Sequence, residues 1–200
     1  MYHIQKNKIH YLNVFFELHQ RIHPFGLTET RLKSHIPSEG LSLPHYSLIR
    51  KDAARSQYTG LAVYIPSSIS KIVRHRPDSE SEAVESVWLE IQTPKSSILI
   101  SYVYRNPAAT FDWYDQFVTM RDRVQGCKLN VVLLGDFNID MQKTSPAWDS
   151  MIYLFGLDSM ITSPTRITPH SSTLIYHIYT SDTSIVSNIL VLAKGISDHF

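Results

Sequence analysis

The stretch NVVLLGDFNID, residues 130–140, decides the fold class. A short apolar run that ends at a glycine is typical of a buried strand, and Asp136 and Asn138 follow directly after it. Open α/β folds usually place ligand sites at this carboxyl edge of a sheet, so both side chains are candidates for chemistry. A turn that Asp and Asn side chains stabilise, without a functional role, is the alternative explanation. We assign no role to Asp140.

The other apolar patterns predict a chain of mixed class, either α/β or α+β. Apolar residues recur every three or four positions in three segments, which is typical of amphipathic helices, and Thr110 and Ser145 are candidate N-caps. Short β-branched or aromatic runs bounded by Pro, Gly or Ser predict strands. The predicted helices span residues 8–22, 110–124 and 145–156, and the predicted strands span 60–65, 84–91, 98–104, 129–134, 173–179 and 185–191. The last two strands are expected to be antiparallel neighbours, because no helical pattern separates them.

Bulk composition predicts one soluble globular domain that covers residues 1–200. The chain is 43% hydrophobic, its formal net charge is +1, and Cys127 is its single cysteine. This charge neither indicates nor excludes a nucleic-acid partner. One cysteine rules out an internal disulfide, so the expected location is intracellular, in the nucleus or the cytoplasm. No apolar run is long enough to span a membrane, and the N-terminus lacks the layout of a signal peptide.

Three more polar side chains complete a candidate site. Glu29 stands in GLTET, and Asp198 and His199 stand in the SDH sequence near residue 200. Taken singly, each has a structural explanation, as a surface or capping acid, a turn residue and a solvated histidine. Taken together, two carboxylates suit Mg²⁺ better than Zn²⁺, while the aspartate, asparagine and histidine can orient water and a phosphate oxygen. This set of residues is typical of phosphodiester cleavage.

Seven short motifs make the interpretation more specific by their order. They are GLTETRL (26–32), GLAVYIP (60–66), ESVWLEI (85–91), YRNPAA (104–109), LLGDFNID (133–140), SPTRITPHSSTLI (163–175) and SDHF (197–200). In this order they resemble the endonuclease domain of LINE-type, non-LTR retrotransposons, within the endonuclease/exonuclease/phosphatase superfamily and related to apurinic/apyrimidinic endonucleases. The resemblance implies an α/β four-layer sandwich, in which helices flank two central, mostly antiparallel sheets. It places the site at the edge where both sheets meet.

The resemblance also implies an activity and a role for each motif residue. The expected activity is Mg²⁺-dependent nicking of DNA, with Mn²⁺ as a possible substitute metal. The resemblance implies no membrane partner, and it does not indicate the oligomeric state. It implies that Glu29 and Asp198 are metal ligands. It implies that Asp136 orients or deprotonates the attacking water and that Asn138 contacts that water and the phosphate. Tyr104 is implied as a hydrogen-bond donor to a phosphate oxygen, Thr165 as a phosphate contact, and His199 as the group that stabilises charge on the leaving oxygen.

Two departures from the family pattern predict impaired activity. Where the family has an aspartate that holds the histidine of the SDH motif, this chain has Tyr176. A phenol is neutral near pH 7, so it cannot stabilise an imidazolium as a carboxylate does. The family's first strand, with its metal-site asparagine, is expected to be shortened or missing, and the chain is read as truncated at both ends. The alternative hypothesis is therefore an inactive retroelement remnant that at most binds nucleic acid.

Overall fold

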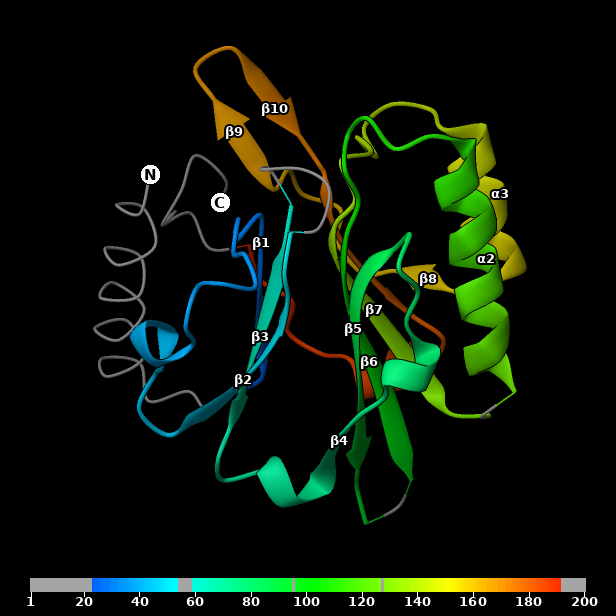
Figure 1. Cartoon of the computed structure of the whole chain (residues 1–200). Coiled ribbons are helices and arrows are strands. Elements are labelled where there is room, and N and C mark those ends of the chain that lie inside the picture. Colours follow the sequence, from blue (N-terminus) through cyan, green and yellow to red (C-terminus); the bar gives the residue numbers. More distant parts are fainter. Residues whose placement is uncertain (1–22, 54–58, 95, 127, 192–200) are drawn as a thin grey trace.

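The computed structural model describes residues 23–53, 59–94, 96–126 and 128–191, and two sheets form its centre (Figure 1). The smaller sheet has the order β1-β3-β2 and is antiparallel throughout. Its strands are β1 (Phe25–Thr28), β2 (Tyr46–Lys51) and β3 (Leu61–Pro66), and β3 confirms the strand predicted over 60–65. The helix predicted over 8–22, and the question of a first-strand asparagine, lie outside the described residues.

The larger sheet has the order β4-β5-β6-β7-β11-β8. Only the β6–β7 pair is parallel among the described strand pairs of this sheet. Its strands are β4 (Val73–His75), β5 (Glu85–Gln92), β6 (Ser97–Tyr104), β7 (Asn130–Asp136), β8 (Asp158–Ser159) and β11 (Tyr176–Thr180). The strands predicted over 84–91, 98–104 and 129–134 are thereby confirmed. A separate hairpin, β9 (Arg166–Thr168) with β10 (Ser171–Thr173), projects from one end (Figure 1).

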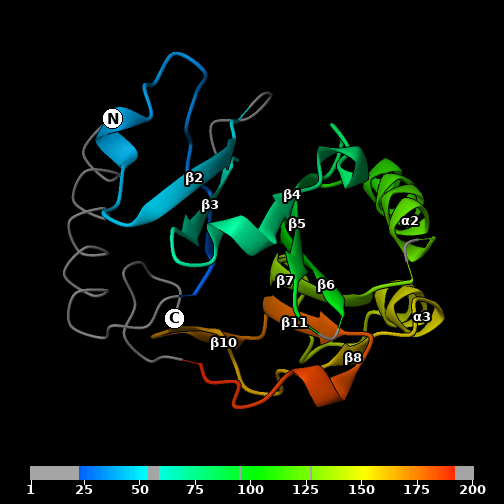
Figure 2. The same cartoon turned by 90° about the horizontal axis from the view of Figure 1, so that it is seen from below.

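Two helices, α2 (Phe111–Gln125) and α3 (Pro146–Leu154), cover one face of the larger sheet (Figures 1 and 2). The apolar stripe of α2 packs with Trp148 of α3 into a core of stacked and tilted rings. Both helices begin where the sequence predicts, although neither Thr110 nor Ser145 makes a side-chain capping bond. Gly156 ends α3, because its φ of 61° lets the Leu157 amide bond back to the Ile152 carbonyl at 3.2 Å. Short 3-10 turns occur at Glu39–Leu41, Ser70–Ile72, Pro77–Ser79 and Thr183–Ile185.

The opposite face of the larger sheet packs on the smaller sheet. Alternate residues of β3, among them Leu61 and Val63, meet Val87, Leu89 and Tyr102 in a buried apolar layer. Helices, large sheet and small sheet therefore follow one another as layers, and the predicted sandwich of mostly antiparallel sheets is confirmed. Among the described residues, no helix has the length and hydrophobicity that a membrane span requires.

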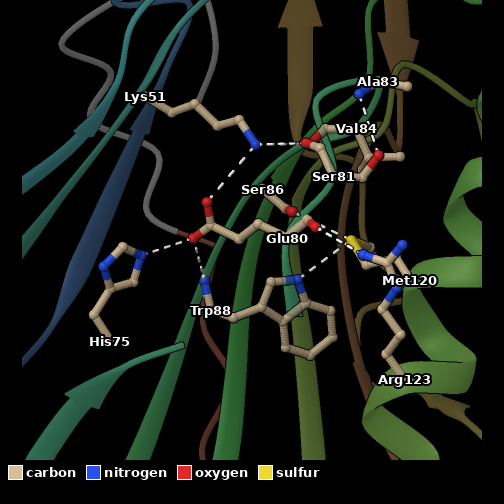
Figure 3. A network of polar contacts seen from close by, with 10 residues as sticks. All are labelled: Lys51, His75, Glu80, Ser81, Ala83, Val84, Ser86, Trp88, Met120 and Arg123. Atoms are coloured by element: carbon tan, nitrogen blue, oxygen red, sulfur yellow. Dashed lines mark hydrogen bonds and ion pairs between the residues drawn. The ribbon is translucent and has the colours of Figure 1, made fainter. Parts of the chain in front are cut away.

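Polar contacts around Glu80 tie the three layers together (Figure 3). The carboxylate of Glu80 accepts from His75 Nε2 at 2.7 Å and from the Trp88 amide at 3.4 Å, and Lys51 Nζ lies 3.7 Å from it. The backbone oxygen of Glu80 accepts from Arg123 of α2 at 3.2 Å. Trp88 itself is buried under α2, where its indole donates to the sulfur of Met120, so it is a packing residue.

Two strand predictions near the C-terminal end need correction. The segment predicted as one strand over 173–179 is broken at Leu174 and Ile175, between β10 and β11. The strand predicted over 185–191 is wrong: after the turn at Thr183–Ile185, no strand is formed up to residue 191. Polar residues interrupt this apolar run, and Asn188 takes a φ of 55°, which a continuous strand does not accommodate.

Candidate active site

Three side chains stand in register at one end of the larger sheet. Tyr104 at the end of β6 pairs with Asp136 at the end of β7, and Asp136 pairs on its other side with Tyr176 at the start of β11. Residues that pair directly across a sheet share a face, so all three belong to the face that packs on the smaller sheet. The strand pairing thus brings together residues that are far apart in the chain.

The turn after β7 has an unusual backbone that fixes Asp136 and Asn138. Gly135 passes so close to β6 that a Cβ atom there would lie 1.8 Å from the Val103 carbonyl oxygen. Asn138 adopts a left-handed φ of 50°, and its amide donates to Asp136 Oδ1 at 3.1 Å. This is the Asp-stabilised turn that the sequence offers as an alternative explanation, and it orients both candidate side chains.

The YRNP and GDFN motifs hold one another through the backbone of Arg105. Its amide donates to the Asp136 carbonyl at 2.8 Å, and its own carbonyl accepts from Asn138 Nδ2 at 2.9 Å. The Arg105 guanidinium is buried, and it lies 5.5 Å from the ring of Trp113 and 5.4 Å from that of Tyr114. Arg105 is thus a positioning residue that the sequence patterns did not predict, although its place directly after Tyr104 was a signal.

Glu29 reaches the same place from the smaller sheet. It follows β1 in a left-handed conformation, with φ of 53°, and Tyr104 donates its hydroxyl hydrogen to Glu29 Oε1 at 2.8 Å. On the C-terminal side of Glu29, the Thr30 amide donates to the Gly60 carbonyl and the Arg31 amide donates to the Thr59 carbonyl. These bonds hold the turn against the residues that directly precede β3. Left-handed non-glycine residues are strained, and such strain often collects at functional sites. Glu29 and Tyr104 therefore join the two sheets at their shared edge.

Burial gives Asp136 an unusual titration. The carboxyl is fully buried, and burial, opposed by the bond from the Asn138 amide, raises its pKa to about 7. The charge of Glu29 raises this pKa further, whereas the charge of Arg166 and the side chain of Tyr176 lower it. Burial and the bond to Glu29 likewise raise the pKa of the Tyr104 hydroxyl. Asp136 is therefore a carboxyl whose proton affinity suits acid–base chemistry near neutral pH.

One buried oxygen of Asp136 is available to bind a cation or a polar substrate. Oδ2 is buried and makes no close hydrogen bond within the described part of the chain. Two carboxylates, Glu29 and Asp136, interact unfavourably here, and a hard divalent cation with oxygen ligands would relieve this repulsion. No group of three His, Cys, Asp or Glu side chains is placed for metal binding among the residues that the structure describes, and Asp198 and His199 lie outside them.

Thr165 is buried at the base of the hairpin, next to this site. Its hydroxyl accepts from the amides of Ile175 at 3.1 Å and Tyr176 at 2.9 Å, so it fixes the entry into β11. The next residue, Arg166, is the cation whose charge reaches Asp136. The family resemblance predicted Thr165 of the SPTR motif as a site residue and did not predict Arg166, although an arginine is the motif's only charged side chain.

A second ordered cluster lies on the other face of the same strands. His177 is buried, its Nε2 contacts the Ile139 carbonyl at 2.8 Å, and its ring stacks on Phe137 at 5.0 Å. Tyr179 Oη meets His177 Nδ1 at 3.1 Å and accepts from the indole of Trp148 at 2.8 Å. These bonds hold the Asp136–Ile139 segment in place from the face of the sheet that the helices cover. No sequence pattern predicts this supporting role of His177, which is marked only by its position directly after Tyr176.

Solved structures with the same arrangement of elements are similar to the chain. No family model and no curated protein sequence matches it. The endonuclease domain of TRAS1, a telomere-specific non-LTR retrotransposon, superposes with a TM-score of 0.67 at 12% identity, over 92% of this chain and 81% of that one. The fold is that of the endonuclease/exonuclease/phosphatase proteins. A protein of that family from Leptotrichia buccalis gives 0.63 at 15% identity, over 91% and 84% of the two chains. The AP endonuclease LMAP from Leishmania major gives 0.67 at 13% identity, over 89% and 75%.

Proposed function

We propose that this chain is a Mg²⁺-dependent phosphodiesterase of the retrotransposon endonuclease type, which nicks DNA with impaired efficiency. The observation that carries the proposal is the meeting of Glu29, Tyr104 and Asp136 at the edge shared by both sheets. Two of the similar structures, a retrotransposon endonuclease domain and an AP endonuclease, support DNA as the substrate class.

Asp136 acts as the general base in this proposal. A water molecule beside Oδ2 gives its proton to that oxygen while its own oxygen attacks the phosphorus, and the bond from phosphorus to the leaving oxygen breaks. A carboxyl with a pKa of about 7 keeps a large ionised fraction near neutral pH and binds the transferred proton well. The Asn138 amide keeps Asp136 oriented through Oδ1, which leaves Oδ2 for the water.

Glu29 would hold Mg²⁺, and Asp198 is the second proposed ligand. The bound ion would supply Lewis-acid stabilisation of the phosphate oxygens. Tyr104 orients the Glu29 carboxylate through its 2.8 Å bond, and it can turn its hydroxyl to a phosphate oxygen when substrate enters. Thr165 and His199 keep their proposed roles as a phosphate contact and as the group that stabilises the leaving oxygen.

Tyr176 explains the proposed impairment. It pairs with Asp136 in the sheet, and its side chain lowers the pKa of that residue, at the place where the family's aspartate would orient the histidine. His199 then lacks a carboxylate at position 176 that could stabilise its charged form. Loss of an equivalent orienting aspartate in a serine protease lowers turnover by about 10⁴-fold, so a large effect is expected here.

The test is nicking of supercoiled plasmid by the chain, by Tyr176→Asp, and by Tyr176→Asp combined with Glu29→Ala, each with Mg²⁺ and with Mn²⁺. We expect weak nicking by the natural chain, at least about 100-fold faster nicking by Tyr176→Asp, and loss of that gain with Glu29→Ala. Glu39→Ala, which removes an exposed carboxylate, is the matched control for the alanine change.

A metal readout separates the proposal from its alternative, an inactive remnant that at most binds nucleic acid. Tyr176 at the aspartate position is the observation that favours the remnant. Mg²⁺ should raise the melting temperature of the natural chain and not that of Glu29→Gln, even if nicking is slow. A folded Tyr176→Asp variant that neither nicks DNA nor responds to Mg²⁺ would establish the remnant instead.

A further inference from the structure

Glu85 adds a carboxylate to the row of polar side chains at the end of the larger sheet. It begins β5 and pairs with Tyr104 of β6, which pairs in turn with Asp136 of β7. Directly paired residues share a face, so Glu85 also faces the smaller sheet. Val87, two residues later on the same strand, lies in the apolar layer between the sheets. Glu85 has no role in the proposed mechanism.

The Glu85 carboxylate bonds to the backbone that leads into β3. The side chain is partly buried, and the Gly60 amide donates to its Oε2 atom at 3.1 Å. Burial raises the pKa of this carboxyl above its ordinary value, although the Gly60 amide, the Thr59 side chain and the charge of Lys51 each lower it. Burial of a carboxylate costs free energy unless it accepts hydrogen bonds, so the bond from Gly60 helps to keep Glu85 in this place.

Gly60 also lies against the turn that carries Glu29. Its φ of 107° is one that side chains rarely adopt, and a Cβ atom there would lie 2.6 Å from Thr30 Oγ1. The Gly60 carbonyl accepts from the Thr30 amide at 3.1 Å, and the Thr59 carbonyl accepts from the Arg31 amide at 2.9 Å. Gly60 thus gives its amide hydrogen to the carboxylate on β5 and its carbonyl oxygen to the turn after β1.

This turn needs support because its backbone is strained. Glu29 and Arg31 both have left-handed φ values, of 53° and 57°. Left-handed residues other than glycine persist only where the surrounding contacts hold them. Tyr104 closes a ring of such contacts, because it bonds to Glu29 at 2.8 Å and pairs with Glu85 in the sheet. The place of the Glu29 carboxylate therefore depends on both ends of this ring.

We propose that Glu85 is a positioning residue for Glu29. Through the Gly60 amide, its carboxylate holds the left-handed turn in the place where the Glu29 carboxylate meets Tyr104. The positioning itself rests on these contacts, whereas its consequence for Mg²⁺ rests on the proposed function. The competing explanation is a carboxylate that only balances the charge of Lys51. Glu85→Gln separates the two, because it keeps an oxygen that can accept from Gly60 and loses the charge.

Hydrogen exchange of backbone amides, measured by NMR in EDTA, tests the positioning without metal. Glu85→Ala should speed exchange of the Thr30 and Arg31 amides at least about tenfold relative to the amides of the β5–β6 pair, and Glu85→Gln should recover most of this protection. The matched control is Glu90→Ala, which removes another partly buried carboxylate of β5, bonded to Arg76 at 2.8 Å. It should leave the relative exchange of these two amides unchanged.

The Mg²⁺ response measures the consequence for the site. In the Tyr176→Asp background, Glu85→Ala should raise the Mg²⁺ concentration for half-maximal nicking at least about fivefold, because a loosened Glu29 binds the ion less well. Nicking at saturating Mg²⁺ should change less, and Glu85→Gln should recover most of the metal response.

The exchange result decides the proposal whatever the nicking result. Unchanged exchange at Thr30 and Arg31 in Glu85→Ala, or an equal rise in Glu90→Ala or in Glu85→Gln, would overturn it. If Glu85→Ala does not fold, Glu85→Asp, with a shorter carboxylate, should speed the same exchange at least about threefold, and no change there would overturn the proposal. Selective exchange at these two amides without any Mg²⁺ response would support the positioning and overturn the proposed function instead.

Discussion

Asp136 and His177 are two buried titratable groups on paired strands, yet their surroundings differ. Asp136 faces the smaller sheet, whereas His177, paired with Gly135, belongs to the opposite face and packs under the helices. Burial drives both toward the neutral form: it raises the pKa of Asp136 to about 7 and lowers that of His177 to about 4. The same physical cause therefore acts on both faces of one strand pair.

The difference lies in how their polar atoms are satisfied. Both ring nitrogens of His177 have partners, in the Ile139 carbonyl and the Tyr179 hydroxyl. Asp136 Oδ2 has no such partner among the described residues, and the left-handed Asn138 follows close by. Buried groups with complete hydrogen bonding stabilise a fold, whereas incomplete ones cost stability and persist where function requires them. We therefore expect the face that holds His177 to support the fold, and we propose the face that holds Asp136 as the place of the chemistry.

The largest effect should come from a substitution that forces β6 and β7 apart, because both faces of the sheet depend on the close approach of these strands. Gly135→Ala would place a methyl group 1.8 Å from the Val103 carbonyl oxygen, with a backbone φ of 154°, so β6 and β7 must separate. We expect a loss of more than about 4 kcal/mol in the free energy of unfolding, measured by urea denaturation. Gly40→Ala, where the new Cβ meets nothing within 4 Å, is the control. A stable Gly135→Ala protein would show that the strand end adapts easily and that Asp136 is not rigidly held.

The second effect tests the support role of His177. His177→Leu removes the ring's polar contacts and leaves the Ile139 and Leu174 carbonyls and the Tyr179 hydroxyl without that partner, at an expected cost of about 2–3 kcal/mol. His177→Gln can still donate to Ile139 and should recover part of this loss. His170→Leu, on the exposed hairpin turn, should change stability little. Equal stability of the leucine and glutamine variants would contradict a role for these hydrogen bonds.

Sequence patterns predicted the regular elements around the site better than the site's own geometry. The ends of β6 and β7 and the starts of α2 and α3 follow from local apolar spacing, and they fix Tyr104 and Asp136. The proximity of Glu29 to Tyr104 depends on a contact between residues 75 positions apart, which local patterns do not encode. The strand predicted over 185–191 failed for the opposite reason, because apolar residues suggested a pairing that the backbone at Asn188 does not support.

The roles of Arg105 and His177 could not be predicted from the sequence, for a related reason. A buried arginine that contacts carbonyls and aromatic rings has the same sequence signature as an exposed one. A buried histidine likewise cannot be told from a surface histidine without its tertiary partners. Only the family resemblance pointed to the YRNP and SPTR segments at all, and it pointed to Tyr104 and Thr165 rather than to the neighbouring arginines.

A third effect concerns acid stability. The pKa of His177 falls from 6.5 to about 4 on folding, so its contribution is fully present above pH 6.5 and is lost as pH falls toward 4. Between pH 7 and pH 5 we expect this group to lower the free energy of unfolding by on the order of 1–2 kcal/mol, measured by urea denaturation at each pH. His177→Gln should be spared this loss, so its stability relative to the natural chain should rise by this amount from pH 7 to pH 5, whereas the control His170→Gln should change with pH as the natural chain does. If the natural chain and His177→Gln change in stability equally between pH 7 and pH 5, the buried, neutral histidine is contradicted.

The smallest effect has the opposite sign and completes the comparison. Because folding raises the pKa of Asp136 from 3.8 to about 7, its contribution is fully present below pH 3.8 and is lost as pH rises through 7. Asp136→Asn keeps an oxygen for the Asn138 amide and cannot ionise, so its stability relative to the natural chain should be greater at pH 8 than at pH 6.5, by on the order of 1 kcal/mol. Urea denaturation in EDTA at both pH values measures this difference without metal, and the exposed Asp158→Asn is the control. If Asp136→Asn is destabilising by the same amount at both pH values, Asp136 is an ordinary structural carboxylate, and the contrast with His177 disappears.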